Sequence, residues 1–318
     1  MKRIGWIDFL RGFSMILILV FHTEVYYKGE EIATPYYFYT TNAIILFYFI
    51  SGYLLYRDTT FDIKSKLRSI GRHLLIPYFI FTSIIALPKL LIRNSDINLV
   101  EIVSNILLGN ASWFIAALIV AEIFFSIILW ISHGKNIWLS TITILTFIIY
   151  YLLPFNQHNY WQWQDALLAF DFLYIGYLYN KHQTVFHPIN KSYISLLLLS
   201  ILILLKVYEY HMDFPMRNIT IKNVPLFLAD TITWLLFIVT IIQYIPKCNP
   251  IEWTGRHCII YYFLCGGCPL IVSMMMNRIG FAYEGHCYRF ILAFLLVYTL
   301  ASILTWFINR YTPFLIGR

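Results

Sequence analysis

The chain has 318 residues, of which 60% are hydrophobic and only 12% charged, with a formal net charge of +7. Soluble domains carry about 25% charged residues, so this composition excludes a large water-soluble globular protein. Apolar stretches nearly free of charge recur along the whole length, as expected of helices that cross about 30 Å of hydrocarbon. The positive charge therefore indicates a membrane-associated topology, and no nucleic-acid partner is expected.

The N-terminal segment begins with Lys2 and Arg3 and continues as an apolar run, which is how a signal peptide would start. Asp8 and Arg11 interrupt the run, and no small-x-small cleavage pattern follows. We therefore expect a retained first transmembrane helix.

Hydropathy and flanking residues predict an all-α membrane bundle of about ten helices. The expected spans are residues 6–27, 40–56, 74–92, 112–131, 137–153, 165–180, 193–208, 224–245, 257–275 and 288–308. Most of the Lys and Arg outside these spans fall on the side that holds both termini, which the positive-inside rule places in the cytoplasm. Because no repeat or linker is visible, we expect one multi-pass domain over residues 1–318 in the cytoplasmic (inner) membrane of the cell.

The first predicted helix carries Asp8, Arg11 and His22, and charged groups inside a span often mark a functional route. Arg11 and His22 are close to three helical turns apart, so they share one stripe over about 16 Å of rise. Asp8 can neighbour Arg11 on the same face. Two interpretations stay open: a functional pair, or an interfacial Asp8–Arg11 ion pair with His22 as a packing residue.

The following segments add further signals. ISGYL (50–54) supplies small residues for close helix contact. The basic stretch KSKLRSIGRHLLIPY (64–78) is expected as a cytoplasmic loop, which either sets the topology or holds phosphates. The expected outer loop PFNQHNYWQWQ (154–164) suits an interfacial aromatic belt and also sugar faces and hydroxyls.

The five cysteines all lie in the last quarter of the chain. Cys265 and Cys268 have CxxC spacing, but no ligand cluster accompanies them, so we interpret them as packing residues and expect no metal site.

In their order along the chain, several of these segments resemble acyltransferase family 3, the membrane O-acyltransferases that modify bacterial polysaccharides and other acceptors. The sharpest element is Arg-x10-His in IDFLRGFSMILILVFH (7–22). ISGYL, LLIPY (74–78), WFIAAL (113–118) and GRHCIIYYFL (255–264) follow in the family's order. The resemblance covers essentially the whole chain.

The resemblance implies that His22 is the essential histidine, that Arg11 is its companion, and that the basic stretch serves a coenzyme A donor. Acyl-coenzyme A, most simply acetyl-coenzyme A, would then be a co-substrate, with no permanently bound cofactor. The donor site is assigned to Arg68, Arg72, Trp113 and Ser51. Two departures stand out: the spacing Arg68-x3-Arg72 where members often have Arg-x-x-Arg, and Cys265 where many members have a histidine.

Neutral imidazole can act as a base or carry an acyl group near pH 7. His22 would lie roughly 24 Å from the cytoplasmic edge, where an extended pantetheine arm could meet an outer hydroxyl. Glu24 and Asp165 at the outer mouth, together with Glu122, are candidates for binding the acceptor. For the intramembrane acids Glu122, Asp171 and Asp230, two interpretations stay open: structural pairing with buried cations or hydroxyls, which we favour, and proton transfer.

The predicted function is O-acylation, most simply O-acetylation, of a cell-envelope glycan or lipid-linked sugar. The alternative is a glycan exporter of the same architecture without acyl transfer. Self-association stays open.

Overall fold

The computed structural model describes residues 4–29, 36–57, 61–92, 99–154, 159–186, 192–209 and 223–317, and these form helices and no strand. The all-α fold class is therefore confirmed. The chain divides into two compact units, each built from two segments. Unit 1 comprises Met1–Phe47 and His182–Phe307, and unit 2 comprises Tyr48–Lys181 and Ile308–Arg318. The single domain over residues 1–318 stays a prediction.

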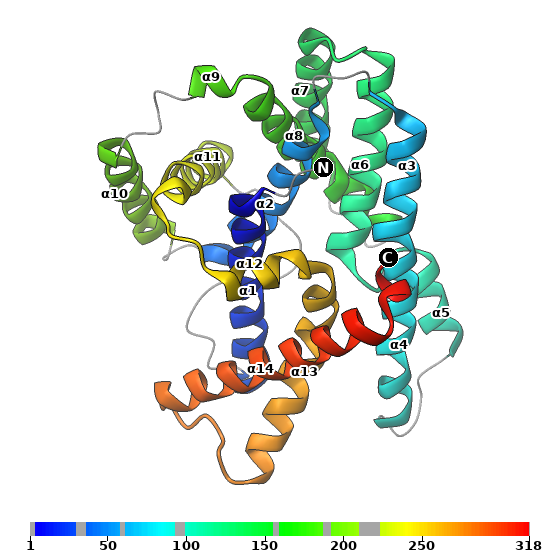
Figure 1. Cartoon of the computed structure of the whole chain (residues 1–318), viewed down its shortest axis with the longest axis vertical. Helices are drawn as coiled ribbons and strands as arrows, with labels where there is room; N and C mark the ends of the chain where they lie inside the picture. Colours follow the sequence, from blue (N-terminus) through cyan, green and yellow to red (C-terminus); the bar gives the residue numbers. More distant parts are fainter. Residues whose placement is uncertain are drawn as a thin grey trace. The chain divides into compact units, whose positions relative to one another are not determined.

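Unit 1 is organised around the first helix (Figure 1). Its helices are α1 (Gly5–Lys28), the first part of α2 (Tyr36–Leu55), α9 (Gln183–Phe186), α10 (Ser192–Glu209), α11 (Val224–Ile241), η4 (Ile242–Tyr244), α12 (Asn249–Arg256), α13 (Cys258–Arg278) and most of α14 (Cys287–Tyr311). Within this unit α1 packs against α12 and α13, and α10 packs against α11.

Two glycines bring the backbones of α1 and α12 into contact. A Cβ on Gly12 would lie 1.9 Å from the carbonyl oxygen of Ile251, and a Cβ on Gly255 would lie 1.7 Å from that of Asp8. No side chain fits at either position, so the crossing needs glycine on both helices. Arg11 precedes Gly12 directly and is held beside this crossing.

Unit 2 contains the basic stretch, with helix α6 beside it (Figure 1). Its helices are the last part of α2, α3 (Ile63–Ile70), the π-helical turn η1 (Gly71–Leu75), α4 (Ile76–Ile92), α5 (Leu99–Leu107), α6 (Trp113–Ile131), α7 (Asn136–Leu152), η2 (Tyr160–Gln162), α8 (Trp163–Lys181) and η5 (Pro313–Ile316). Helix α6 packs against α3 and α8, and α7 packs against α8. A second glycine crossing joins α2 to α8, where a Cβ on Gly52 would lie 1.8 Å from the carbonyl oxygen of Leu173.

The basic stretch is a helix, so the expected loop conformation was wrong. Asp62 caps α3 by accepting a hydrogen bond from the backbone N–H of Ser65 at 3.2 Å, and Lys, Leu and Arg are good helix formers. Helices α3, η1 and α4 follow one another without a break from Ile63 to Ile92, which gives a rod about 45 Å long.

Among the described residues, seven helical segments are long and apolar enough to cross a membrane. They are Gly5–Lys28, Phe38–Leu55, Ile63–Ala86, Trp113–Ile131, Val224–Ile241, Cys258–Arg278 and Cys287–Tyr311. Each of the ten expected spans coincides with a helix, but α7, α8 and α10 are not among the seven. Helix α7, with 17 residues, is apolar but shorter. The total of ten spans and the cytoplasmic position of the termini therefore stay predictions.

Candidate functional site

Arg11 and His22 lie on one face of α1, and both side chains are partly buried. Within the part of the chain that the structure describes, neither side chain takes part in a hydrogen bond or an ion pair. The Asp8–Arg11 ion pair of the alternative interpretation is therefore not formed. The His22 ring meets only the neighbouring Phe21 ring in an edge contact, with 5.9 Å between centroids. The ring nitrogens of His22 therefore have no hydrogen-bond partner in the described part of the chain.

Helix α13 covers this face of α1. The Cys258 thiol lies within electrostatic range of both Arg11 and Asp8. Farther along, the Ser273 hydroxyl donates a hydrogen bond of 2.8 Å to the backbone oxygen of Tyr26. Tyr26 follows His22 by one helical turn on the same stripe. Sequence reasoning missed it, although its i+4 spacing from His22 was a usable signal.

The opposite face of α1 is closed by internal contacts. Glu24 is only 3% exposed, and one of its carboxylate oxygens lies 3.0 Å from Lys28 Nζ. The same ammonium group stands over the rings of Tyr283 and Phe290, at 5.0 and 4.7 Å from their centroids. Glu24, a candidate acceptor ligand, therefore already has a cationic partner.

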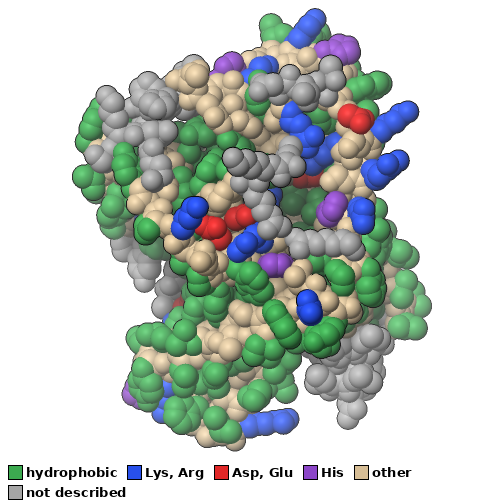
Figure 2. All heavy atoms as spheres, in the orientation of Figure 1, with side chains coloured by type: hydrophobic (Ala, Val, Ile, Leu, Met, Phe, Trp, Pro, Cys, Tyr) green, Lys and Arg blue, Asp and Glu red, His purple; other side chains and the backbone are tan. Residues whose placement is uncertain are grey.

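Helix α3 also has two different faces. One face carries Lys64 and Arg68, and Arg72 follows four residues later in the π-helical turn η1. All three are exposed and make no ion pair with the residues that the structure describes. Figure 2 shows Lys and Arg side chains gathered over this helix. We call these three residues the basic stripe. Repulsion between cations spaced in this way is relieved when a polyanion binds.

The other face of α3 carries Lys66, which sequence reasoning missed. Lys66 Nζ lies 2.8 Å from Glu122 Oε2, and the Ser51 hydroxyl donates to the other carboxylate oxygen of Glu122. The Glu122 carboxylate of α6 therefore contacts side chains from both α2 and α3. Ser51 and Glu122, which were assigned to different subsites, thus lie together. Trp113 is the first residue of α6, roughly 13 Å of helix rise from Glu122, and does not join them.

Asp165 belongs to a buried cluster of amides in unit 2. Asn159 Nδ2 donates to Asp165 Oδ2 at 2.8 Å, and Gln162 Nε2 donates to Asn110 Oδ1 at 3.2 Å. Trp161 has a positive φ of 53° and donates its backbone N–H to the Leu108 oxygen at 2.7 Å. The amides are directed toward one another. Residues 155–158 of the expected outer loop lie outside the described part of the chain.

The comparison with protein families gives a single result. The family model described as an acyltransferase domain, acyltransferase family 3, matches residues 4–313. The chain belongs to this family. No curated protein matches the chain, and no solved structure matches it either. The protein is therefore an acyltransferase-family membrane protein, and its own residues must indicate donor and acceptor.

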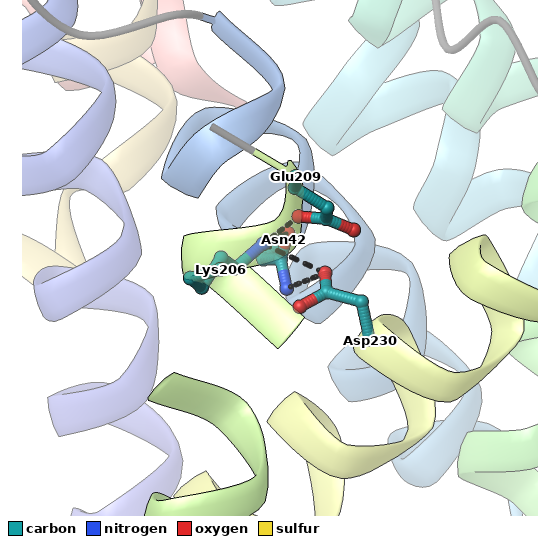
Figure 3. A network of polar contacts seen from close by, with 4 residues as sticks. All are labelled: Asn42, Lys206, Glu209 and Asp230. Atoms are coloured by element: carbon teal, nitrogen blue, oxygen red, sulfur yellow. Dashed lines mark hydrogen bonds and ion pairs between the residues drawn. The ribbon is translucent and has the colours of Figure 1, made fainter. Parts of the chain in front are cut away.

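This acyltransferase-family protein also contains a buried polar network around Lys206, in unit 1 (Figure 3). Lys206 Nζ lies 2.8 Å from Asp230 Oδ2 and 3.0 Å from Glu209 Oε2. Asn42 accepts from Lys206 at 3.3 Å and donates to the same Asp230 oxygen at 2.8 Å. All four side chains are buried. The cluster ties α2, α10 and α11 together.

The intramembrane acids have the partners expected of structural residues. Asp230 pairs with Lys206, Glu122 pairs with Lys66, and Asp171 accepts a hydrogen bond of 2.7 Å from the Thr146 hydroxyl. Each of the three acids therefore has a cation or a hydroxyl as its partner in the structure, and their roles stay predictions. Within the described residues, no group of three His, Cys, Asp or Glu side chains is placed to hold a metal ion.

Proposed function

We propose that the protein is a membrane O-acyltransferase that moves an acyl group from cytoplasmic acyl-coenzyme A to a hydroxyl of a cell-envelope glycan or lipid-linked sugar. In the simplest case the group is acetyl. The observation that carries this proposal is the His22 imidazole, which lies on the Arg11 face of α1 without a hydrogen-bond partner among the described residues. A neutral imidazole in that situation can take a proton from a hydroxyl.

The chemistry balances without an added reactant. The acceptor oxygen bonds to the acyl carbon, the carbon–sulfur bond of the thioester breaks, and the hydroxyl proton passes through the imidazole to the departing thiolate. In a covalent variant, the imidazole itself first takes the acyl group and then yields it to the hydroxyl. In both routes Arg11, which has no carboxylate partner among the described residues, is available to a negatively charged part of the donor.

The basic stripe supports a coenzyme A donor. The partner of Lys66 is Glu122, which lies at the middle of the apolar helix α6. The basic stripe on the other face of α3 is therefore at a similar height along α6. Charged groups at that level cannot face hydrocarbon without a large cost. Water and a polyanion are the environments that suit them, and coenzyme A brings several phosphate charges. Arg68 and Arg72 are the residues we assign to these phosphates.

For the acceptor, Glu24, Asp165 and Glu122 stay the proposed ligands. Each of them has an internal partner in the structure, so an acceptor hydroxyl would share the carboxylate with that partner. Ser51 and Trp113 stay proposed donor residues, with Ser51 acting through Glu122.

The test uses purified protein reconstituted in lipid vesicles and acetyl-coenzyme A labelled in the acetyl group. We expect label on the glycan acceptor, or slow hydrolysis of the donor when acceptor is absent, and neither with His22→Gln. Loss of glycan O-acetylation in cells that lack the protein is the matching result in vivo. Glycan movement across the vesicle membrane without any use of the donor would instead establish the exporter.

A further inference from the structure

Helix α13 has a proline in its interior. Pro269 lies within Cys258–Arg278 and is buried. Proline has no backbone N–H, so it cannot donate the usual helical hydrogen bond to the carbonyl four residues earlier. That carbonyl belongs to Cys265. The carbonyl oxygen of Cys265 is therefore an acceptor without its normal helical donor.

Two interactions set the register of α13 against α1. The Arg11 guanidinium lies within electrostatic range of the Cys258 thiol, and the backbone oxygen of Tyr26 accepts a hydrogen bond from the Ser273 hydroxyl. Fifteen residues separate the first of these interactions from the second on both helices. The two helices therefore run parallel and keep the same register between these two points. In this register the backbone of His22 is level with Pro269.

The side chains of α1 then point to the turn that contains Cys265. Side chains on an α-helix lean toward its N-terminus, so the imidazole of His22 lies closer to the N-terminal end of α1 than its own Cα atom does. Tyr26 shows this lean directly. Its backbone is level with Ser273, whereas its phenol oxygen would be 3.7 Å from a Cβ on Gly266 and is within electrostatic range of the Cys265 thiol.

His22 lies between Arg11 and Tyr26 on the face that these two residues present to α13. Measured around α1, about 20° separates His22 from Arg11 and about 40° separates it from Tyr26. Tyr26 contacts α13, and Arg11 lies within electrostatic range of Cys258 at the start of α13, so His22, which lies between them, is on the side of α1 that is directed to α13. The two ring nitrogens of a histidine are distinguished by the hydrogen bond that one of them makes, often to a backbone carbonyl.

We propose that Pro269 is a positioning residue: it frees the Cys265 carbonyl to accept a hydrogen bond from one ring nitrogen of His22 during acyl transfer. The other ring nitrogen then faces the reacting hydroxyl in the tautomer that can accept its proton. Catalytic hydrogen bonds often form fully only when substrate is bound, which agrees with the unbonded ring in this structure. This inference rests on the role proposed above for His22.

The test replaces Pro269 with Ala and, separately, with Val, which fills a similar volume. Both residues restore the N–H and return the Cys265 carbonyl to the helix. We expect kcat to fall about 10- to 100-fold, the size of effect seen when partners that orient a histidine are removed. KM for acetyl-coenzyme A should stay unchanged. The thermal midpoint should be equal or higher, because a proline inside a helix is unfavourable.

The matched control is Pro88→Ala, the same change within helix α4, which should leave kcat unchanged. A purely structural role for Pro269 makes a different prediction, since a helix with a restored hydrogen bond should be as active as before. Wild-type kcat in both Pro269 variants would overturn the inference, as would a loss of kcat accompanied by a lower thermal midpoint. An active His22→Gln would instead overturn the proposed function itself.

Discussion

Helix α1 in unit 1 and helix α3 in unit 2 are built on the same plan with different surroundings. Each has one face whose polar groups are satisfied internally, Glu24 with Lys28 on α1 and Lys66 with Glu122 on α3. Each has another face that carries side chains without a hydrogen bond or ion pair in the described part of the chain, Arg11 and His22 on α1 and the basic stripe on α3 and η1. On α1 that face is covered by α13, whereas on α3 it is exposed.

Because one face is covered and the other exposed, the two faces suit different tasks: the reaction on α1 and donor binding on α3. A partly buried imidazole without a partner is costly unless a substrate uses it, so the α1 face suits the reacting groups. An exposed row of cations costs little in water and attracts a polyanion, so the α3 face suits the donor. The satisfied faces on both helices hold the helices in place. Charged and polar residues of the same type are therefore expected to have different roles, depending on which face of α1 or α3 carries them.

The largest effect is expected at His22. His22→Gln keeps a hydrogen-bonding side chain of similar size but removes the titratable base, so acyl transfer should fall by roughly 10²–10⁴-fold. The transfer rate of labelled acetyl groups in vesicles measures it, with the amount of inserted protein as the control. Near-normal turnover would show that His22 is a packing residue and that α1 has only a structural role. An acyl-imidazole trapped on quenching would favour the covalent route.

A smaller loss is expected when the basic stripe is shortened. The double variant Arg68→Ala, Arg72→Ala should raise KM for acetyl-coenzyme A by about tenfold or more, because each charge-assisted hydrogen bond contributes about 1.5–3 kcal/mol. The turnover number at saturating donor should change much less. Lys135→Ala, which removes an exposed cation elsewhere in unit 2, is the matched control. Donor affinity that is equal in both variants would place the phosphates elsewhere.

The Lys66–Glu122 pair should affect stability more than donor binding. Lys66→Met leaves a carboxylate whose side chain is 6% exposed, whereas Glu122→Gln leaves an ammonium group whose side chain is 23% exposed. Breaking a buried pair costs about 3–5 kcal/mol, and the more buried remaining charge should cost more. The unfolding midpoint in detergent should therefore fall further for Lys66→Met. The double variant should recover most of the loss, and a double variant as unstable as Lys66→Met would disprove the pairing.

The smallest effect is expected at Glu24. Glu24→Gln keeps one hydrogen-bonding oxygen beside Lys28, and the rings of Tyr283 and Phe290 still face the ammonium group. We expect the free energy of unfolding to fall by about 1 kcal/mol. KM for the glycan should rise only slightly, because the amide oxygen that remains can still accept a hydrogen bond from an acceptor hydroxyl. An unchanged KM for the glycan would remove Glu24 from the proposed acceptor ligands and leave it only as the partner of Lys28.

Local spacing predicted the parts of the structure that depend on one helix at a time. The Arg11–His22 stripe follows from helical periodicity alone, and the ten expected spans coincide with helices to within a few residues. The density of positive charge in the basic stretch favours a cytoplasmic loop, whereas Asp62 as an N-cap and the helix-forming residues after it favour the helix that the structure has. The same stretch, read as a helix, would have put Lys66 on the side opposite Arg68.

Partners from distant parts of the chain could not be predicted. Nothing in the sequence near Glu122 indicates Lys66, and nothing near Lys206 indicates Asn42, because these contacts depend on how helices pack. The amides of residues 159–164 illustrate the same limit. Their composition suits a sugar surface, but in the structure Asn159 is used to hold Asp165. Composition indicates which groups can bind a ligand, and packing decides which of them are free to do so.

The contact between Gly12 and Gly255 has a consequence for biosynthesis. Helix α1 takes its final place only against α12, which is synthesised more than 200 residues later. At about 5–20 residues per second, roughly 12–50 s pass between the synthesis of these two glycines. During that interval Arg11 and His22 lack the α12 and α13 surfaces that cover them in the finished protein. A chain interrupted before Asn249 would therefore carry both residues and still be inactive, and its uncovered first helix would be a target for membrane quality control.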